Sequence, residues 1–239
     1  DKNKKYILAI DLGTSGPKTA IVSTRGEVID YAFVENRLQL FPDGGAEQNP
    51  EEWWQSILTG FKTILAKKSV WAEDIIAICC STQWSGTVAV DGDGNHLMNA
   101  LIWLDSRGSR YVKKISDGII KIEGYGVTKL QRWLRLTGGA PSHSGKDSIA
   151  HILYIKKKLL DVYRKTYKFL EPKDYINLRL TGKFAASFDS ITLHWVTDNR
   201  DIYNIRYDDT LIRMSTIDRD KLPELKHAMD VLGTVRKEV

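Results

Sequence analysis

The segment from Asp11 to Lys18, Asp-Leu-Gly-Thr-Ser-Gly-Pro-Lys, carries the first side chains that could do chemistry. An acid at the end of a strand can hold a magnesium ion, usually through water. Glycines such as Gly13 let the backbone approach an anion and aim its amides at it. Thr14 and Ser15 add hydroxyl donors, and Lys18 adds a positive charge. The segment therefore predicts a phosphate cradle, although a glycine-rich hairpin turn without a ligand has the same composition.

The elements that would position this segment are short strands. Residues 6–10, 18–23 and 27–31 are apolar runs separated by tight turns, which predicts an antiparallel meander. Asn49 caps a predicted helix with Pro50 at its first position, and apolar residues follow at helical spacing. Residues 75–80 are apolar without alternation, which predicts a buried strand.

The second half of the chain has mainly helical patterns. We expect helices over most of residues 111–137 and after Ile149, and another that opens at Pro172 and closes near Gly182. Strands first and then strands mixed with helices indicate the α/β class.

Five segments, taken in order, resemble the FGGY carbohydrate kinases of the actin/Hsp70/sugar-kinase superfamily. Ala9–Ser15 is similar to the opening hairpin of that family, and the next similarity is an A-E-Q-x-P-x-x-W-W pattern at 46–54. An S-x-Q pattern follows at 81–83, A-x-x-W-x-D-x-R at 100–107, and K-D-Y with L-T-G at 173–182. Within the family, the sequences of these motifs are most similar to those of xylulokinases.

This resemblance implies a ribonuclease-H-like domain, with a mixed sheet flanked by helices, over residues 1–239. The domain would be the amino-terminal, sugar-binding half of an ATP-dependent kinase. A carboxy-terminal domain outside this chain would hold most of the adenosine, so the chain alone would be inactive. The implied cofactors are ATP and Mg²⁺, and the implied substrate is a ketose such as D-xylulose or a related polyol.

The resemblance also implies roles for individual residues. Asp11 would help to organise magnesium and the phosphates. The phosphate path would be lined by Gly13, Thr14, Ser15 and Lys18. The sugar would contact Gln83, Trp84, Ser85, Trp103, Asp105 and Arg107. Charged and amide groups suit the hydroxyls of a polyol, and an aromatic ring can stack on its C–H face. The two tryptophans could instead be core residues.

Two departures from the family pattern bear on the activity. Xylulokinases carry Met-His after the glutamine, where this chain has Trp84-Ser85. The catalytic aspartate expected after L-T-G falls, without a gap, on Ser187. A carboxylate is needed to accept the proton of the sugar hydroxyl, so we predict Asp189 for this role, with Asp198 as a second choice.

Two other functions stay open at this stage. One is a sugar-binding or regulatory relative that has no catalysis. The other is a nuclease of the same fold class, which needs several clustered carboxylates to hold two metals; Asp11 is the only obvious one here.

The composition excludes several other classes. The net charge is +5, with 35 basic and 30 acidic residues and no recognisable nucleic-acid module, so we expect no nucleic-acid partner. No stretch approaches the roughly 18 apolar residues of a membrane span, and the start has no secretory pattern. The adjacent Cys79 and Cys80 are interpreted as small buried hydrophobes in a reducing, cytoplasmic setting. A homodimer stays open.

Overall fold

The computed structural model describes residues 4–239, which form two compact units. The first unit comprises the chain up to Leu38 together with Gln48–Gln83. The second comprises Gln39–Glu47 and Trp84–Val239. Each unit is described below by itself.

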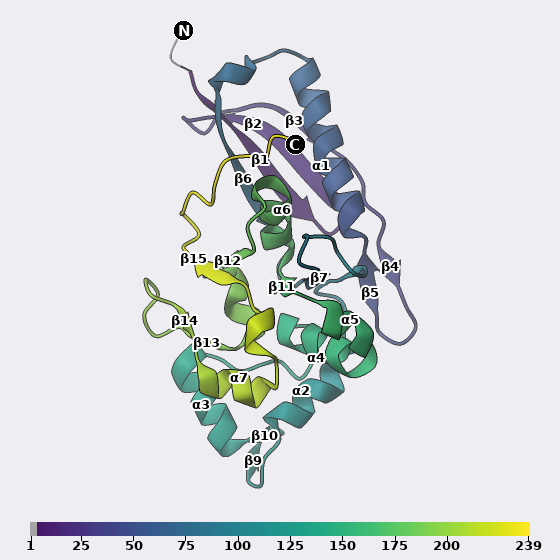
Figure 1. Ribbon diagram of the computed structural model, residues 1–239, viewed down its shortest axis with the longest axis vertical. Helices are drawn as coiled ribbons and strands as arrows, with labels where there is room; N and C mark the ends of the chain where they lie inside the picture. The colour runs from purple at the N-terminus through teal and green to yellow at the C-terminus, as the bar shows by residue number, and fades with distance from the viewer. Residues whose placement is uncertain (1–3) are drawn as a thin grey trace. The chain divides into compact units, whose positions relative to one another are not determined.

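The first unit is a four-stranded sheet with one long helix (Figure 1). The strands β1 (Tyr6–Gly13), β2 (Gly16–Ser23) and β3 (Val28–Phe33) form the predicted antiparallel meander. The strand β6 (Ile75–Thr82) runs parallel to β1, and the order is β3-β2-β1-β6. A short 3₁₀ turn, η1 (Ala72–Asp74), leads into β6.

The helix of this unit is α1 (Pro50–Ala66), and it begins as the sequence predicts. The side chain of Asn49 accepts a hydrogen bond from the backbone N–H of Glu51 at 2.9 Å, which satisfies one of the free donors of the first turn. Trp53, Ile57 and Ile64 are fully buried along one stripe of the helix. This stripe packs α1 against β2 and β3.

The prediction that β6 is a buried strand is wrong. Cys79 is exposed, Cys80 is partly exposed, and Ile76 is 59% exposed. The reason is that β6 lies at the edge of the sheet within the described chain. A continuous apolar run is typical of a strand covered on both faces, but a sequence alone does not say which elements cover it.

The second unit contains most of the helices. They are α2 (Ser109–Ser116), α3 (Val127–Thr137), α4 (Ser148–Lys158), α5 (Leu160–Lys165), α6 (Pro172–Thr181) and α7 (Asp209–Ser215), with 3₁₀ turns η2 (Ser190–His194) and η3 (Arg219–Lys221). The fully buried core includes Trp133, Ile149, Ile152, Phe169 and Leu211.

Several small sheets connect these helices. A three-stranded sheet has the order β4 (Gln39–Leu40), β5 (Ala46–Gln48), β8 (Ala100–Leu101). Pairs form between β7 (Val88–Val90) and β11 (Lys168–Leu170), β9 (Lys121–Ile122) and β10 (Tyr125–Gly126), β12 (Ala185–Ser187) and β15 (Glu224–Lys226), and β13 (Thr197–Asp198) and β14 (Arg206–Tyr207).

The predicted helical stretch over 111–137 is interrupted by the β9–β10 hairpin. Gly118 and Gly126 lie so close that a Cβ on Gly118 would come within 2.7 Å of the Cα of Gly126. This contact closes the base of the hairpin and separates α2 from α3. Among the residues that the structure describes, no helix combines the length and the apolar character needed to cross a bilayer.

Candidate functional site: a hairpin and two polar networks

The predicted phosphate cradle is a two-residue turn between β1 and β2. Gly13 pairs with Gly16, which leaves Thr14 and the exposed Ser15 at the tip. Gly16 has φ 142°, and a Cβ there would lie 2.0 Å from the carbonyl oxygen of Val34, so the packing of the chain itself requires glycine. A Cβ on Gly13 would meet only the oxygen of Gly16, at 3.5 Å. Within the part of the chain that the structure describes, packing therefore does not demand glycine at position 13, and a ligand can approach the backbone there.

Asp11 and Lys18 lie opposite each other on the same two strands. Asp11 is inside β1 and pairs with Lys18 in the register, so it does not end the strand as predicted. The Nζ of Lys18 is 3.1 Å from Oδ2 of Asp11, and both side chains are more than half exposed. Because both side chains are exposed, they remain accessible to a ligand. An exposed ion pair contributes little to stability, so a ligand can replace it at little cost.

Two glutamines brace the hairpin tip. Gln83 directly follows β6, and its Nε2 donates to Oε1 of Gln48 at 2.7 Å. The Nε2 of Gln48 donates to the carbonyl oxygen of Thr14 at 2.7 Å, and Oγ1 of Thr14 donates to Oε1 of Gln83 at 3.2 Å. The three residues thus form a closed set of contacts, with Thr14 contributing both its hydroxyl and its backbone oxygen. The A-E-Q pattern of the sequence contains Gln48 but does not predict a role for this residue at the site.

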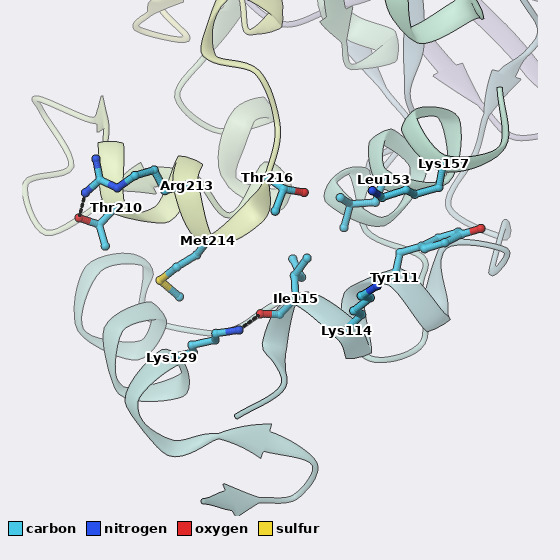
Figure 2. A pocket seen from close by; sticks show the side chains of 10 residues that line it. All are labelled: Tyr111, Lys114, Ile115, Lys129, Leu153, Lys157, Thr210, Arg213, Met214 and Thr216. Atoms are coloured by element: carbon cyan, nitrogen blue, oxygen red, sulfur yellow. Dashed lines mark hydrogen bonds between the residues drawn. The ribbon is translucent and has the colours of Figure 1, made fainter. Parts of the chain in front are cut away.

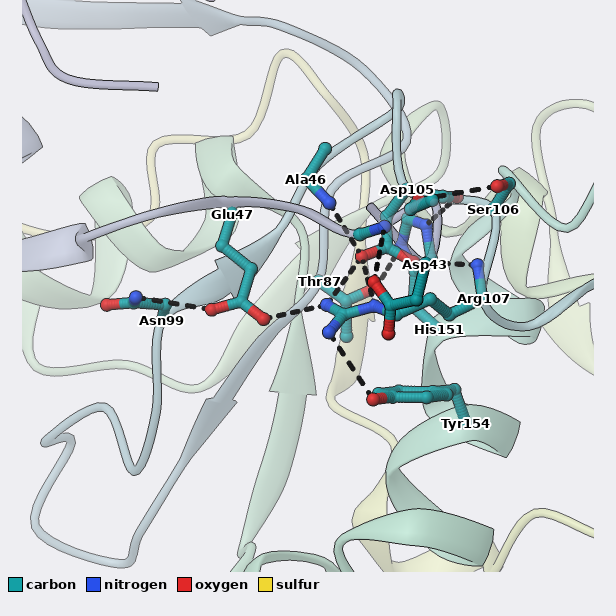
Figure 3. Close-up of polar contacts among 12 residues, drawn as sticks. Asp43, Ala46, Glu47, Thr87, Asn99, Asp105, Ser106, Arg107, His151 and Tyr154 are labelled. Carbon is teal, nitrogen blue, oxygen red and sulfur yellow. Dashed lines mark hydrogen bonds and ion pairs between the residues drawn. The ribbon is translucent and has the colours of Figure 1, made fainter. Parts of the chain in front are cut away.

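In the second unit, Asp105 and Arg107 form a buried network (Figure 3). Asp105 is fully buried, and its Oδ2 accepts from the backbone N–H of Ala46 at 3.0 Å and from Nε and Nη2 of Arg107 at 2.9 and 2.6 Å. Its Oδ1 accepts from the backbone N–H of Arg107 at 3.0 Å. Contacts within the chain therefore occupy both oxygens of Asp105.

Arg107 also reaches two further partners. Its Nη2 donates to Glu47 at 2.7 Å, and Nη1 donates to the hydroxyl of Tyr154 at 3.3 Å. Burial opposes the charge of this guanidinium, but the hydrogen bonds to Asp105 and Glu47 outweigh burial and raise the pKa of Arg107 above its ordinary value. Figure 3 shows Glu47 tied in turn to Asn99, at 3.2 Å. Glu47 belongs to the same A-E-Q pattern, and the sequence does not predict its role in this network either.

His151 supports this network from α4. Its Nε2 lies 3.3 Å from the carbonyl oxygen of Asp105, and its Nδ1 lies 3.2 Å from Oγ1 of Thr87. Complete burial lowers the pKa of His151 to about 4, so the ring is neutral near pH 7. A neutral ring that donates through Nε2 and accepts through Nδ1 satisfies both contacts.

The backbone of residues 84–87 is tightly held. Ser85 has φ 62°, which is unusual for a residue with a side chain, and its hydroxyl donates to the carbonyl oxygen of Lys146. Trp84 is 56% exposed and Trp103 is 42% exposed. Neither tryptophan is a core residue, and both present ring surface that a ligand could contact.

Glu171 holds residues 84–87 through a hydrogen bond from Gly86. Its Oε2 accepts from the backbone N–H of Gly86 at 2.9 Å, and Oε1 accepts from the hydroxyl of Ser148. Burial raises the pKa of Glu171 to about 8. His194 approaches at 3.9 Å, but burial and the nearby His151 lower its pKa to about 3, so it offers no positive charge. Glu171 is therefore held largely in its protonated form.

The predicted catalytic carboxylate, Asp189, lies on the surface beside a second buried acid. Asp174 is buried, and its Oδ1 accepts from the hydroxyl of Ser190 at 3.0 Å; that hydroxyl is 2.8 Å from the hydroxyl of Ser187. Burial raises the pKa of Asp174 to about 7. Asp189 is more than half exposed and forms an ion pair with Lys173 at 2.6 Å.

The electrostatics of Asp189 and of the second choice, Asp198, are similar. Partial burial opposes the charge of Asp189, but hydrogen bonds from Lys173 and Ser187 outweigh it and lower its pKa. Asp198 is held by Arg200 at 2.7 Å, and this contact lowers its pKa to about 2. Within residues 4–239, no group of three or more His, Cys, Asp and Glu side chains is placed to hold a metal.

Comparison with known proteins extends these observations. The family model described as the N-terminal domain of the FGGY family of carbohydrate kinases matches residues 6–239. A xylulose kinase of Bacillus subtilis is 28% identical over 98% of this chain and 44% of its own length. A glycerol kinase of Thermococcus gammatolerans is 25% identical over 99% of this chain and 46% of its own length.

The fold has the same relatives. The crystal structure of a "xyloylose kinase" from Brucella ovis superposes with a TM-score of 0.83 at 22% identity, and the match covers 98% of this chain and 45% of that one. The mixed α/β fold is therefore that of the sugar kinases, as predicted. The chain belongs to the FGGY family of carbohydrate kinases and spans less than half the length of the relatives it matches.

Proposed function

We propose that the full-length protein transfers the terminal phosphate of ATP to a hydroxyl of a ketose or polyol, and that this chain supplies the sugar-binding half and the phosphate hairpin. The observation that carries the proposal is the hairpin tip. Gly13 has no packing reason to be glycine, and the tip is braced by Gln48 and Gln83. A braced, open turn with hydroxyls and backbone amides suits a phosphate group.

The proposed cofactors, ATP and Mg²⁺, fit the residues of the hairpin. Mg²⁺ bound to a nucleotide keeps several waters and needs only one or two carboxylates from the protein. Asp11 is an exposed carboxylate that could be one of them. Lys18, on the opposite strand, would then face the phosphates. Mg²⁺, when bound, would neutralise phosphate charge, while this chain orients the phosphates through Gly13, Thr14 and Ser15.

The sugar would contact the polar and aromatic groups that the sequence singled out. Trp84 and Trp103 expose ring surface that can stack on the C–H face of a sugar. Gln83 and Ser85 follow β6, where hydrogen bonds hold the backbone N–H of Gln83 and the hydroxyl of Ser85. Because both oxygens of Asp105 are occupied by the chain, we propose that Asp105 positions Arg107 and does not itself touch the sugar.

Asp189 stays a prediction as the acceptor of the hydroxyl proton. Its ion pair with Lys173 and its lowered pKa make it a weaker base than a free carboxylate. Its contacts resemble those of a surface ion pair. The variant Asp189→Asn decides the point: a loss of turnover of about a hundredfold or more is expected of a general base, with the affinity for sugar preserved. Unchanged turnover would place the base elsewhere in the full-length protein.

The decisive experiment is a coupled assay of ADP release by the full-length protein. D-xylulose, D-ribulose, L-ribulose, glycerol and gluconate would be compared at equal concentration. We expect sugar-dependent release of ADP with one of them, and D-xylulose is the first candidate substrate. The departure at Trp84-Ser85 from the Met-His of xylulokinases leaves room for another substrate.

The second candidate function is a sugar-binding relative without catalysis. The ion-paired state of Asp189 and the serine at position 187 favour it. No ADP release with any sugar, combined with a rise in melting temperature on addition of one of them, would support this function and reject the kinase. The same preparation would test the remaining proposals, a carboxy-terminal domain required for activity and a homodimer, by truncation and by size measurement. Localisation in the cytoplasm also stays a prediction.

A further inference from the structure

A cavity of about 480 Å³ opens among the helices of the second unit. Figure 2 shows its two sides: α2 and α4 contribute Lys114 and Lys157, and α7 contributes Arg213 and Met214, while Lys129 reaches in from α3. None of the residues that line this cavity belongs to the hairpin or to the polar networks described above. A ligand in this cavity would therefore contact neither the hairpin nor those networks.

The charge of the lining is entirely positive. Lys114, Lys129, Lys157 and Arg213 all line the cavity, and no Asp or Glu does. Lys129 donates to the backbone oxygen of Ile115 at 2.6 Å, and Arg213 donates to Thr210 at 3.1 Å. Neither hydrogen-bond partner carries a charge. Outside the lining, however, a hydrogen bond from Lys121 lowers the pKa of the Asp117 carboxyl, and Lys129 lies near enough to help lower it, so the charge of Lys129 is partly compensated.

Two of the four cations have no polar partner at all. Within residues 4–239, the side chains of Lys114 and Lys157 form no hydrogen bond or ion pair. The neighbouring Asp218 forms its ion pair with Lys156, which does not line the cavity. Cations gathered around a hollow repel one another, and this repulsion is relieved when an anion enters.

The inner wall of the cavity is apolar. Leu153 and Ile115 are buried residues of the core, and the partly buried Met214 also lines the cavity. Met adapts its shape to irregular ligands because its side chain is unbranched and polarizable. An inorganic anion would use the cations but leave this wall in contact with water, whereas an organic anion would cover both.

We propose that this cavity binds a small organic anion that has a carboxylate, phosphate or sulfonate group and an apolar body. The anionic group would lie near Lys114, Lys129 and Lys157, and the apolar body would lie on Leu153, Ile115 and Met214. The guanidinium of Arg213 points towards Thr210, away from these lysines (Figure 2). The volume falls in the range typical of small-molecule sites. Sites of this type are lined mainly by apolar groups, with a few polar groups that fix the orientation of the ligand.

The probe for the test is anilinonaphthalene sulfonate, an aromatic sulfonate whose fluorescence rises in apolar surroundings. The full-length protein would be titrated beside the double variant Lys114→Gln/Lys157→Gln. The matched control is Lys62→Gln/Lys165→Gln, which removes two exposed helical lysines outside the cavity. A second probe, N-phenylnaphthylamine, is similarly apolar but neutral. Circular dichroism would verify that all variants are folded.

We expect the double variant to bind the sulfonate about fivefold more weakly or worse, and the control to bind it as the wild type does. Met214→Glu, which adds a negative charge to the wall, should abolish the same binding phase. Equal affinity of wild type and both double variants would overturn the proposal. Equal affinity for the neutral probe and the sulfonate would overturn it as well, since the cations would then play no part.

Discussion

The substitution Glu171→Gln tests the electrostatics beneath the segment that carries Trp84 and Ser85. Glu171 is 2% exposed, and its pKa is raised from 4.5 to about 8 by burial. The folded protein therefore keeps a proton on Glu171 that the unfolded chain loses above its ordinary pKa. The stability linked to this group is complete below about pH 4.5 and is lost as the pH rises towards about 8.

The size of the effect follows from the same values. Each pH unit between the two pKa values costs the folded state about 1.4 kcal/mol, so the total reaches about 5 kcal/mol as an upper limit. Glutamine resembles the protonated acid, because its oxygen can accept from Gly86 and its amide can donate to Ser148. The variant should therefore escape the loss. It should be a few kcal/mol more stable than wild type at about pH 8 and similar at about pH 5.

The assay is urea unfolding of the full-length wild-type protein and variant at several pH values between about 5 and 8. The difference between the two removes contributions shared by other groups, such as His194. Glu73→Gln, at an exposed position, is the control and should change stability by less than about 0.5 kcal/mol. The reasoning fails if Glu171→Gln is strongly destabilised at every pH, because Glu171 would then be ionised and paired with a charged His194.

The other predictions concern the hairpin, the buried ion pair and the helix cap. Gly16→Ala should yield little folded protein because its Cβ would meet the oxygen of Val34. Gly13→Ala should keep the melting temperature of the wild type but lose ADP release. Equal behaviour of the two variants in both measurements would contradict this distinction. Arg107→Lys, which cannot reproduce the fork on buried Asp105, should cost at least about 2 kcal/mol in urea unfolding, and a smaller loss would mean that water enters the network. Asn49→Ala should cost about 1 kcal/mol by removing the cap of α1, and no change would show that another group caps the helix.

The sequence by itself determined the meander, the start of α1, the limits of α6 and the family. These features depend on local rules: strand runs separated by turns, a capping residue before proline, and ordered short motifs. The exposed ring surface of Trp84 and Trp103 rules out the alternative that they are core residues, while their contact with a sugar stays a prediction.

The tertiary structure alone decided which polar groups remain available to a ligand. Gly13 and Gly16 look equivalent in the sequence, but only Gly16 faces the backbone oxygen of Val34. Asp105 looks like a sugar ligand, yet the backbone of Ala46 and the side chain of Arg107 use one of its oxygens and the backbone of Arg107 uses the other. The exposure of Cys79 and the cationic cavity likewise depend on which elements pack against which. Such contacts join residues far apart in the chain, and local patterns do not encode them.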